Sequence, residues 1–108
     1  MVKCVKENQD FLRSVAKVSR FRRKNLIKKA TEDQLKALHQ ITNNVAQEIV
    51  PLKQCVIKKL IRGKYKPYIR EAANKKAGAN RRRKIFVQHG GFLQYIIPAA
   101  LLYLKDLL

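Results

Sequence analysis

The chain of 108 residues has no tryptophan, two cysteines, two histidines and only seven acidic residues. Because Cys4 and Cys55 lie far apart, with no other Cys or His at metal-binding spacing, the sequence lacks a zinc site and the dense disulfide framework of a small secreted domain. His39 and His89 stand beside no nucleophile signature, and neither a glycine-rich phosphate loop nor a carboxylate cluster is present. We therefore expect a non-enzymatic protein that uses no cofactor and no metal ion.

The cysteines and the N-terminus also bear on location. Residues 1–8 lack the roughly 7–15 residue apolar stretch of a signal peptide. Sparse cysteine fits a reducing, intracellular compartment. We expect Cys55 to pack as a small apolar side chain. A disulfide between Cys4 and Cys55 is an alternative that the sequence leaves open. We expect an intracellular protein, and a nuclear one if its partner is DNA.

What the chain has in excess is positive charge, with 25 Lys and Arg against 7 Asp and Glu and a net charge of +18. Such self-repulsion weakens a compact state unless a counter-charge is present, so we expect a polyanionic partner. Nucleic acid is the commonest such partner, followed by an anionic membrane surface and an acidic protein tail. The charge is concentrated in residues 51–91, which hold 13 basic residues and one acidic residue.

Three clusters of basic residues are dense enough for counterion release from phosphates to dominate affinity. The predicted nucleic-acid contacts are Arg20, Arg22, Arg23, Lys24, Lys28 and Lys29; Lys58, Lys59, Arg62, Lys64 and Lys66; and Lys75, Lys76, Arg81, Arg82, Arg83 and Lys84. No base-reading helix, zinc finger or paired aromatic RNA-binding motif accompanies them. Tyr65 and Tyr68 could stack on bases, although we favour packing in the core or on the surface for these two rings. We expect sequence-independent binding, with double-stranded DNA as the partner. The third cluster also has the form of a nuclear-import signal.

Apolar residues recur at helical spacing through the first 78 residues and predict an all-α fold, a small bundle of four to five short helices. The firmest start signal is the capping box from Thr31 to Gln34, which precedes an apolar stripe from Leu35 to Ile49. Pro51 is placed to open a further basic helix. We divide the chain into a basic helical bundle (1–78), a basic glycine-containing linker (79–91) and an apolar C-terminal tail that forms a last helix (92–108).

The tail residues that we expect to act as an anchor are Phe92, Leu93, Tyr95, Ile96, Ile97, Leu101, Leu102 and Leu104. With Pro98 in its middle, the tail is shorter than the roughly 20 apolar residues of a membrane-spanning helix. Three roles stay open: docking into a groove of another protein, lying in a bilayer surface, and completing the core of its own bundle. Gly90 and Gly91 predict a flexible joint before the tail, at which cleavage would release it.

The segment from Arg82 to Leu93, followed by an apolar tail that contains proline, resembles the C-terminal signature of small basic proteins of adenovirus-like elements. These elements are the adintoviruses and the related Maverick or Polinton transposons. Residues 28–38 look like the body of the same family. The resemblance implies a virion component, similar in role to the basic core proteins that condense adenovirus genomes. It also likens Gly90 and Gly91 to sites of adenovirus-type maturation proteases, although Gln88 stands where these proteases favour a large aliphatic residue.

Together, these features predict a DNA-condensing core or minor capsid protein, found in the virion and the host nucleus. Its tail would anchor it to a capsid protein or a membrane. Two alternatives stay open: a membrane-active or membrane-anchored basic protein, and an adaptor that docks through its apolar tail.

Overall fold

The computed structural model describes residues 2–47, 63, 65–74, 76 and 78–105. Within these ranges the chain forms helices and no strand, which confirms the predicted all-α fold. The predicted helix that begins at Pro51 lies outside the described residues. The helices are α1 (Val2–Glu7), α2 (Gln9–Lys17), α3 (Arg20–Lys28), α4 (Glu32–Ala46), α6 (Lys66–Ala73), α7 (Ala79–His89), the 3-10 helix η1 (Gly90–Phe92) and α8 (Leu93–Leu104).

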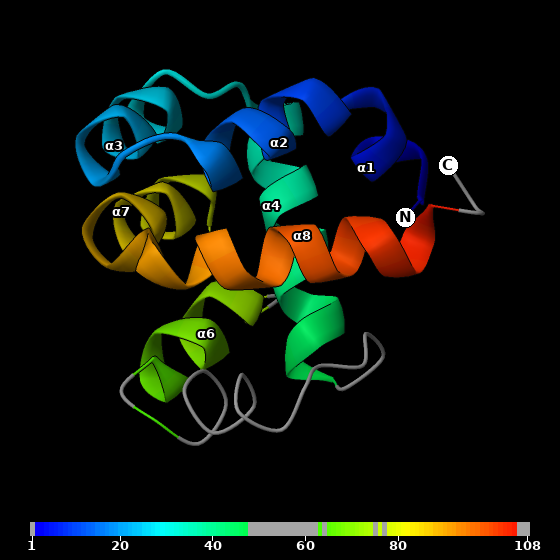
Figure 1. The fold of residues 1–108 in the computed structure, drawn as a ribbon. Helices are drawn as coiled ribbons and strands as arrows, with labels where there is room; N and C mark the ends of the chain where they lie inside the picture. The colour runs from blue at the N-terminus through cyan, green and yellow to red at the C-terminus, as the bar shows by residue number, and fades with distance from the viewer. Residues whose placement is uncertain (1, 48–62, 64, 75, 77, 106–108) are drawn as a thin grey trace.

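Helix α4 lies at the centre of the bundle and α8 crosses it (Figure 1). Helices α1, α2 and α3 cover one side of this pair, α6 covers the other, and α7 lies beside α3. The largest fully buried side chains come from α1, α2, α3, α4, α7, η1 and α8: Val5, Leu12, Val15, Ile27, Leu38, Ile41, Phe86, Phe92, Leu93, Ile96 and Ile97. Burial of such side chains from across the sequence is what holds the short helices together.

Helix α4 begins where the capping box predicts. The Thr31 hydroxyl accepts a hydrogen bond from the Gln34 backbone N–H at 3.2 Å, and the Gln34 side-chain oxygen accepts one from the Thr31 N–H at 2.9 Å. Two of the N–H groups that a helix start leaves without partners are thereby satisfied. The predicted apolar stripe is confirmed as far as Val45, since Leu35, Leu38, Ile41 and Val45 are all buried. Its last residue, Ile49, lies outside the described residues.

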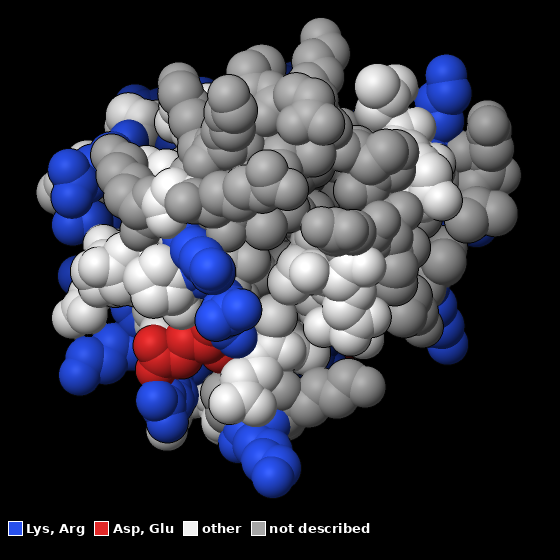
Figure 2. Space-filling view, turned by 90° about the horizontal axis from the view of Figure 1, so that it is seen from below, with Lys and Arg blue, Asp and Glu red and all other residues white. Residues whose placement is uncertain are grey.

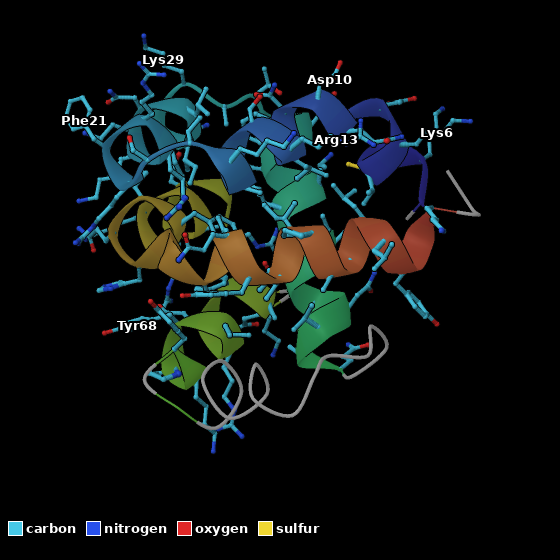
Figure 3. All side chains as sticks on the ribbon, in the orientation of Figure 1. Lys6, Asp10, Arg13, Phe21, Lys29 and Tyr68 are labelled. Atoms are coloured by element: carbon cyan, nitrogen blue, oxygen red, sulfur yellow. The ribbon has the colours of Figure 1, made fainter. Side chains whose placement is uncertain are left out.

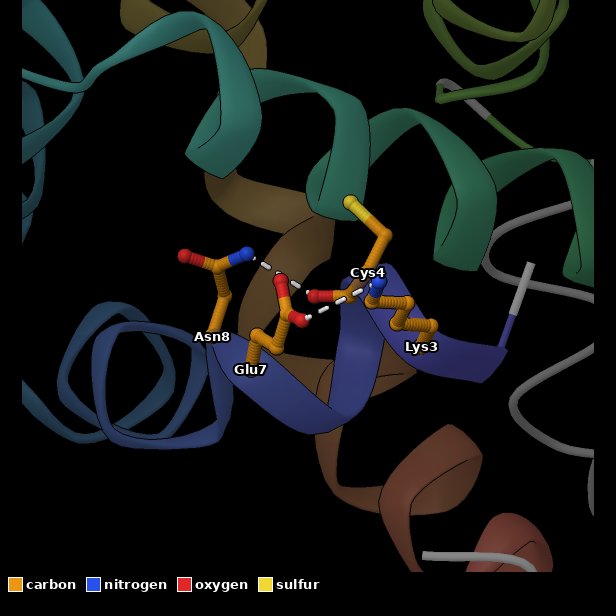
Figure 4. Close-up of polar contacts among 4 residues, drawn as sticks. All are labelled: Lys3, Cys4, Glu7 and Asn8. Atoms are coloured by element: carbon orange, nitrogen blue, oxygen red, sulfur yellow. Dashed lines mark hydrogen bonds and ion pairs between the residues drawn. The ribbon is translucent and has the colours of Figure 1, made fainter.

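The N-terminal helix α1 docks on the start of α4. The Cys4 thiol donates a hydrogen bond to the Asp33 backbone oxygen at 3.4 Å, and burial, with a smaller contribution from the Asp33 charge, raises the pKa of this thiol. The amide of Asn8, the residue after α1, donates to the Cys4 backbone oxygen at 2.8 Å, and within α1 Lys3 pairs with Glu7 at 4.0 Å (Figure 4). Both members of that ion pair are exposed, so it contributes little to stability.

The predicted linker is wrong in its first eleven residues, because Ala79–His89 forms helix α7. Ile85 and Phe86 bury one side of this helix, and Arg83 bonds to α3. Arg and Lys are good helix formers, so a basic sequence with two buried apolar residues folds as a helix once a neighbour covers its apolar side. Helix α7 packs against both α3 and α6, which provide that cover.

The described part of the tail completes the protein's own core. Leu93, Ile96, Ile97 and Ala100 follow the spacing of one helical face and are fully buried. That face packs on α2 and α4. Of the three roles left open by the sequence, the structure supports the third, and the expectation that Phe92, Leu93, Ile96 and Ile97 form an external anchor is corrected. Leu101 is half-buried, Tyr95 and Leu102 are exposed, and the side chain of Leu104 lies outside the described residues.

The glycine pair is not the flexible, accessible joint that we expected. Gly90 is buried, and Gly90–Phe92 forms the 3-10 helix that joins α7 to α8. A Cβ on Gly91 would lie 3.1 Å from the Tyr65 hydroxyl oxygen, so the absence of a side chain allows the tyrosine to approach. In this arrangement a protease has no extended segment to bind at the pair.

The helical stretch Ala79–Tyr103, 25 residues long, is apolar and long enough by composition and length to cross a membrane. Its most apolar window has a mean hydropathy of 1.4, and 44% of that window is buried inside the protein. A helix in a protein core meets the same criterion. Phe86, Phe92, Ile96 and Ile97 are among the buried residues of this stretch.

Candidate nucleic-acid interface

The first predicted basic cluster lies beside the part of the third that α7 carries, Arg81–Lys84, because α3 and α7 pack side by side and run in opposite directions (Figure 1). Helix α3 begins after Ser19, whose hydroxyl accepts a hydrogen bond from the Arg22 N–H at 3.4 Å. Arg23 and Ile27 are the buried residues of α3, so its remaining cations lie on its outer sides. Residues 20–29 contain six Lys or Arg and no acidic residue. The packing thus adds the cations of α7 to an already basic helix.

Arg83 joins the two helices at the C-terminal end of α3. Its Nη1 donates to the backbone oxygens of Ile27 at 3.0 Å, Lys28 at 2.9 Å and Ala30 at 2.8 Å. Ile27 and Lys28 end α3 and Ala30 lies two residues beyond it, where carbonyl groups lack the usual helical N–H partners four residues on. The Ile27 oxygen also accepts the Ala30 N–H at 3.2 Å. A positive charge at this end complements the helix dipole. Arg83 therefore acts as a cap for α3, and the prediction that it contacts nucleic acid is revised.

The two residues before it are also engaged within the protein. Arg82 donates to the Asn74 backbone oxygen at 2.9 Å, and burial lowers the pKa of its guanidinium. Arg81 pairs with Glu71 of α6 at 2.6 Å, but its side chain remains 65% exposed. Together with Arg83, these contacts tie α7 to its neighbours. Within this run of four cations, Arg81 and Lys84 are the exposed ones and remain available to a phosphate.

Arg23 is likewise a structural residue. It is 6% exposed, and its Nε donates to the Val15 backbone oxygen at 3.2 Å. Its Nη2 lies 3.5 Å from the Val18 backbone oxygen and 3.4 Å from the Gln94 side-chain oxygen. Arg23 thereby binds the C-terminal end of α2 and connects α3 to α8, and burial lowers its pKa.

The other predicted contacts are exposed, half-buried or outside the described residues. Arg20, Arg22, Lys28, Lys29, Lys66 and Lys76 are exposed, and Lys24 is half-buried. Phe21 of α3 and Lys29, the residue that follows α3, project away from the body of the protein (Figure 3). Seen from below, Lys and Arg side chains gather on the side that carries α6, with an acidic patch among them (Figure 2). The predicted contacts that lie outside the described residues are Lys58, Lys59, Arg62, Lys64 and Lys75.

A cavity of about 480 Å³ opens where the N-terminal half of α3 meets the C-terminal end of α7. Arg20, Arg23 and Lys24 provide cations to its lining, and aromatic and amide side chains complete it: Tyr65, Tyr68, Phe86, Gln88, His89 and Gln94. The rings of Tyr68 and His89 are stacked, with centroids 3.8 Å apart and planes 7° apart. Tyr68 lies where α6 faces α7 (Figure 3).

Sequence reasoning missed this cavity. Tyr65 and Tyr68 were identified as rings that bases could stack on, but His89, Gln88 and Gln94 were not linked to them. Tyr68 and His89, whose rings stack in the wall, stand 21 positions apart, and no local spacing signals such a pairing. The sequence did contain one further signal of a binding surface, an aromatic residue among cations at Phe21. In the structure its side chain is 74% exposed.

Both histidines have structural contacts in this protein. His39 of α4 is buried, with its Nε2 3.2 Å from the Ala73 backbone oxygen of α6, and His89 stacks on Tyr68. Among the described residues, no group of three or more His, Cys, Asp or Glu side chains is placed to hold a metal ion.

Comparison with known proteins identifies no relative: no family model, no curated protein and no solved structure matches this chain.

Proposed function

We propose that this protein binds double-stranded DNA without sequence specificity, and that the exposed cations of α3 and α7 form the binding surface. The proposal is carried by one observation, the packing of a helix rich in cations and free of acidic residues against the basic helix α7. We call this the α3–α7 surface; its exposed cations are Arg20, Arg22, Lys28, Lys29, Arg81 and Lys84. The protein acts by binding and carries out no reaction.

Phosphate neutralisation suits these residues better than base reading does. Long, exposed Lys and Arg side chains act as mobile point charges, which release counterions from the DNA backbone and carry no sequence information. The net charge of +18 also opposes the compact state, and bound polyanion relieves that repulsion. Binding to the folded form would therefore stabilise the bundle as well as the complex.

The biological setting that we propose is the packaging of a genome. The resemblance of residues 82–93 to small basic proteins of adenovirus-like elements supports a virion core role, and condensation requires the sequence-independent binding described above. The anchoring role predicted for the tail is not part of this proposal, because its central apolar face packs inside the protein.

A pair of double variants tests the surface. Changing Lys28 and Lys29 to Gln removes two cations from the α3–α7 surface, whereas changing Lys3 and Lys6 to Gln removes two exposed cations from α1. We expect the first variant to bind a random-sequence duplex more weakly and to lower its salt slope by about 2, since each phosphate contact contributes about 0.9. The second should resemble the parent. Equal losses in both variants would contradict the assignment of this surface.

A second candidate function, binding to an anionic membrane surface, is favoured by Phe21. This ring is 74% exposed and stands between Arg20 and Arg22. An aromatic residue flanked by cations is typical of segments that lie in a bilayer interface. Sedimentation with vesicles that contain phosphatidylserine, for the parent and for Phe21→Ser, measures this. A loss of vesicle binding in the variant with unchanged duplex affinity would favour the membrane function.

A further inference from the structure

The cavity between α3, α6, α7 and the start of α8 combines positive charge with an aromatic wall. Binding to the DNA backbone does not need this combination. The volume of the cavity, about 480 Å³, falls in the range of roughly 300–1,000 Å³ typical of small-molecule sites. Arg20, Arg23 and Lys24 contribute positive charge from α3, and the stacked rings of Tyr68 and His89 contribute an aromatic wall from α6 and α7.

The cationic side of the cavity contains a buried charge that has no counter-ion among the described residues. Arg23 is 6% exposed, and its hydrogen-bond partners are two backbone oxygens and the neutral Gln94 amide. Within the described part of the chain, no carboxylate forms an ion pair with it. A buried guanidinium is costly unless a charge compensates it, and burial lowers its pKa accordingly. An anion in the cavity, held also by Arg20 and Lys24, would supply that compensation.

The other side of the cavity fits a planar ring. Aromatic side chains bind nucleic-acid bases by stacking, and every base has a face that can stack. Tyr65 adds a third ring beside the Tyr68–His89 pair, and it is held edge-on against Phe92 with centroids 6.1 Å apart. Gln88 and Gln94 place amide groups, which both donate and accept hydrogen bonds, in the same lining.

We propose that this cavity binds one unpaired nucleotide of a DNA strand through its 5′-phosphate and its base. The phosphate lies against Arg20, Arg23 and Lys24, and the base lies against the aromatic wall. The inference rests on the proposed nucleic-acid binding and deepens it, because it adds a site for a single-stranded end to a surface for duplex phosphates.

Titration of the full chain with deoxyadenosine 5′-monophosphate tests the site, with the backbone amide NMR signals of His89, Gly90 and Gly91 as the readout. We expect saturable shifts, and affinity at least about tenfold higher than for deoxyadenosine or inorganic phosphate alone. Equal affinity for inorganic phosphate would overturn the proposal, since the aromatic wall would then contribute nothing. Absence of saturable shifts at those three amides would overturn it as well.

Two matched variants separate the cavity from the general charge of α3. Lys24 lines the cavity and Lys28 lies on the same helix outside it. Lys24→Gln should weaken mononucleotide binding several-fold, whereas Lys28→Gln should leave it unchanged. Tyr68→Leu, checked for folding by circular dichroism, should weaken mononucleotide binding while leaving duplex binding unchanged. Equal effects of the two lysine variants on mononucleotide binding would overturn the proposal.

Short oligonucleotides identify the source of the nucleotide. A single-stranded deoxyadenosine hexamer with a 5′-phosphate should displace the mononucleotide more effectively than the same hexamer without it. Failure of both hexamers to displace it would overturn binding of a strand end. If the parent protein binds the mononucleotide but no duplex, only the proposed duplex binding is contradicted. If it binds duplex but no mononucleotide, only the proposed nucleotide site in the cavity is contradicted.

Discussion

Nη1 of Arg83, in the middle of α7, lies 2.8 Å from the backbone oxygen of Ala30, just beyond the end of α3. The same nitrogen also bonds to the oxygens of Ile27 and Lys28. One guanidinium thereby closes the C-terminal end of a helix more than fifty residues away in sequence. This contact fixes α7 against α3 and so determines which cations share a surface.

Arg83→Gln should lower the free energy of unfolding by about 1.5–3 kcal/mol, the usual range for hydrogen bonds to a charged group. The matched control is Lys84→Gln, which removes an exposed charge from the same helix and should change stability by less than about 0.5 kcal/mol. Urea unfolding followed by circular dichroism measures both variants. Similar stabilities for the two would show that the Arg83 contacts do not hold α3 and α7 together.

The capping box of α4 predicts a second, smaller effect. Thr31→Ala removes the side-chain acceptor for the Gln34 N–H and should cost about 1 kcal/mol. Ser19→Ala removes the longer 3.4 Å bond at the start of α3 and should cost less. Thermal unfolding of the two variants ranks them, and a larger loss for Ser19→Ala would contradict the geometry of these two caps.

The buried residues of α8 should contribute to stability as core residues do. Ile97→Ala deletes a fully buried side chain of α8 and should destabilise the fold by about 2–5 kcal/mol. Leu102→Ala, at a position that is 67% exposed on the same helix, serves as the control and should have little effect. If chemical unfolding gives the parent value for Ile97→Ala, α8 does not pack as described and the tail is free to act as an anchor.

Cys4 should react slowly with alkylating reagents in the folded protein, because burial raises the pKa of its thiol and the thiolate is the reactive form. Site-specific mass spectrometry after iodoacetamide treatment measures this, with the urea-unfolded chain as the control. The raised pKa also means that the folded state holds this proton more tightly. Its contribution to stability is therefore fully present below the ordinary thiol pKa of about 8.5 and is lost as pH rises through the higher folded pKa. A folded-state rate equal to the unfolded one would contradict the burial of Cys4.

Much of the fold could be predicted from local signals. The capping box at Thr31 and the stripe from Leu35 to Val45 depend only on residues three or four positions apart, and both are confirmed. Helix α7 was missed because its stability comes from contacts with α3 and α6, including Arg83 with Ala30, and such contacts leave no periodic trace in the sequence.

The sequence predicts where cations are concentrated, but not which of them are available to a partner. Composition identifies Arg81, Arg82 and Arg83 as cations but does not show that each already has a partner within the protein. An arginine that binds a phosphate and one that binds a group of its own protein differ only in what surrounds the guanidinium in space. For the same reason, the pairing of Tyr68 with His89 could not be seen in a sequence where they stand 21 residues apart.

Binding of the full chain to a random-sequence duplex across a salt series is the sharpest test of DNA binding by the α3–α7 surface, because the slope counts the neutralised phosphates. We expect a slope of roughly −4 to −5, for about five phosphates, with measurable affinity near physiological salt. Weak binding with a shallow slope that vanishes at physiological salt would contradict it and would show that the charge of the α3–α7 surface serves another partner.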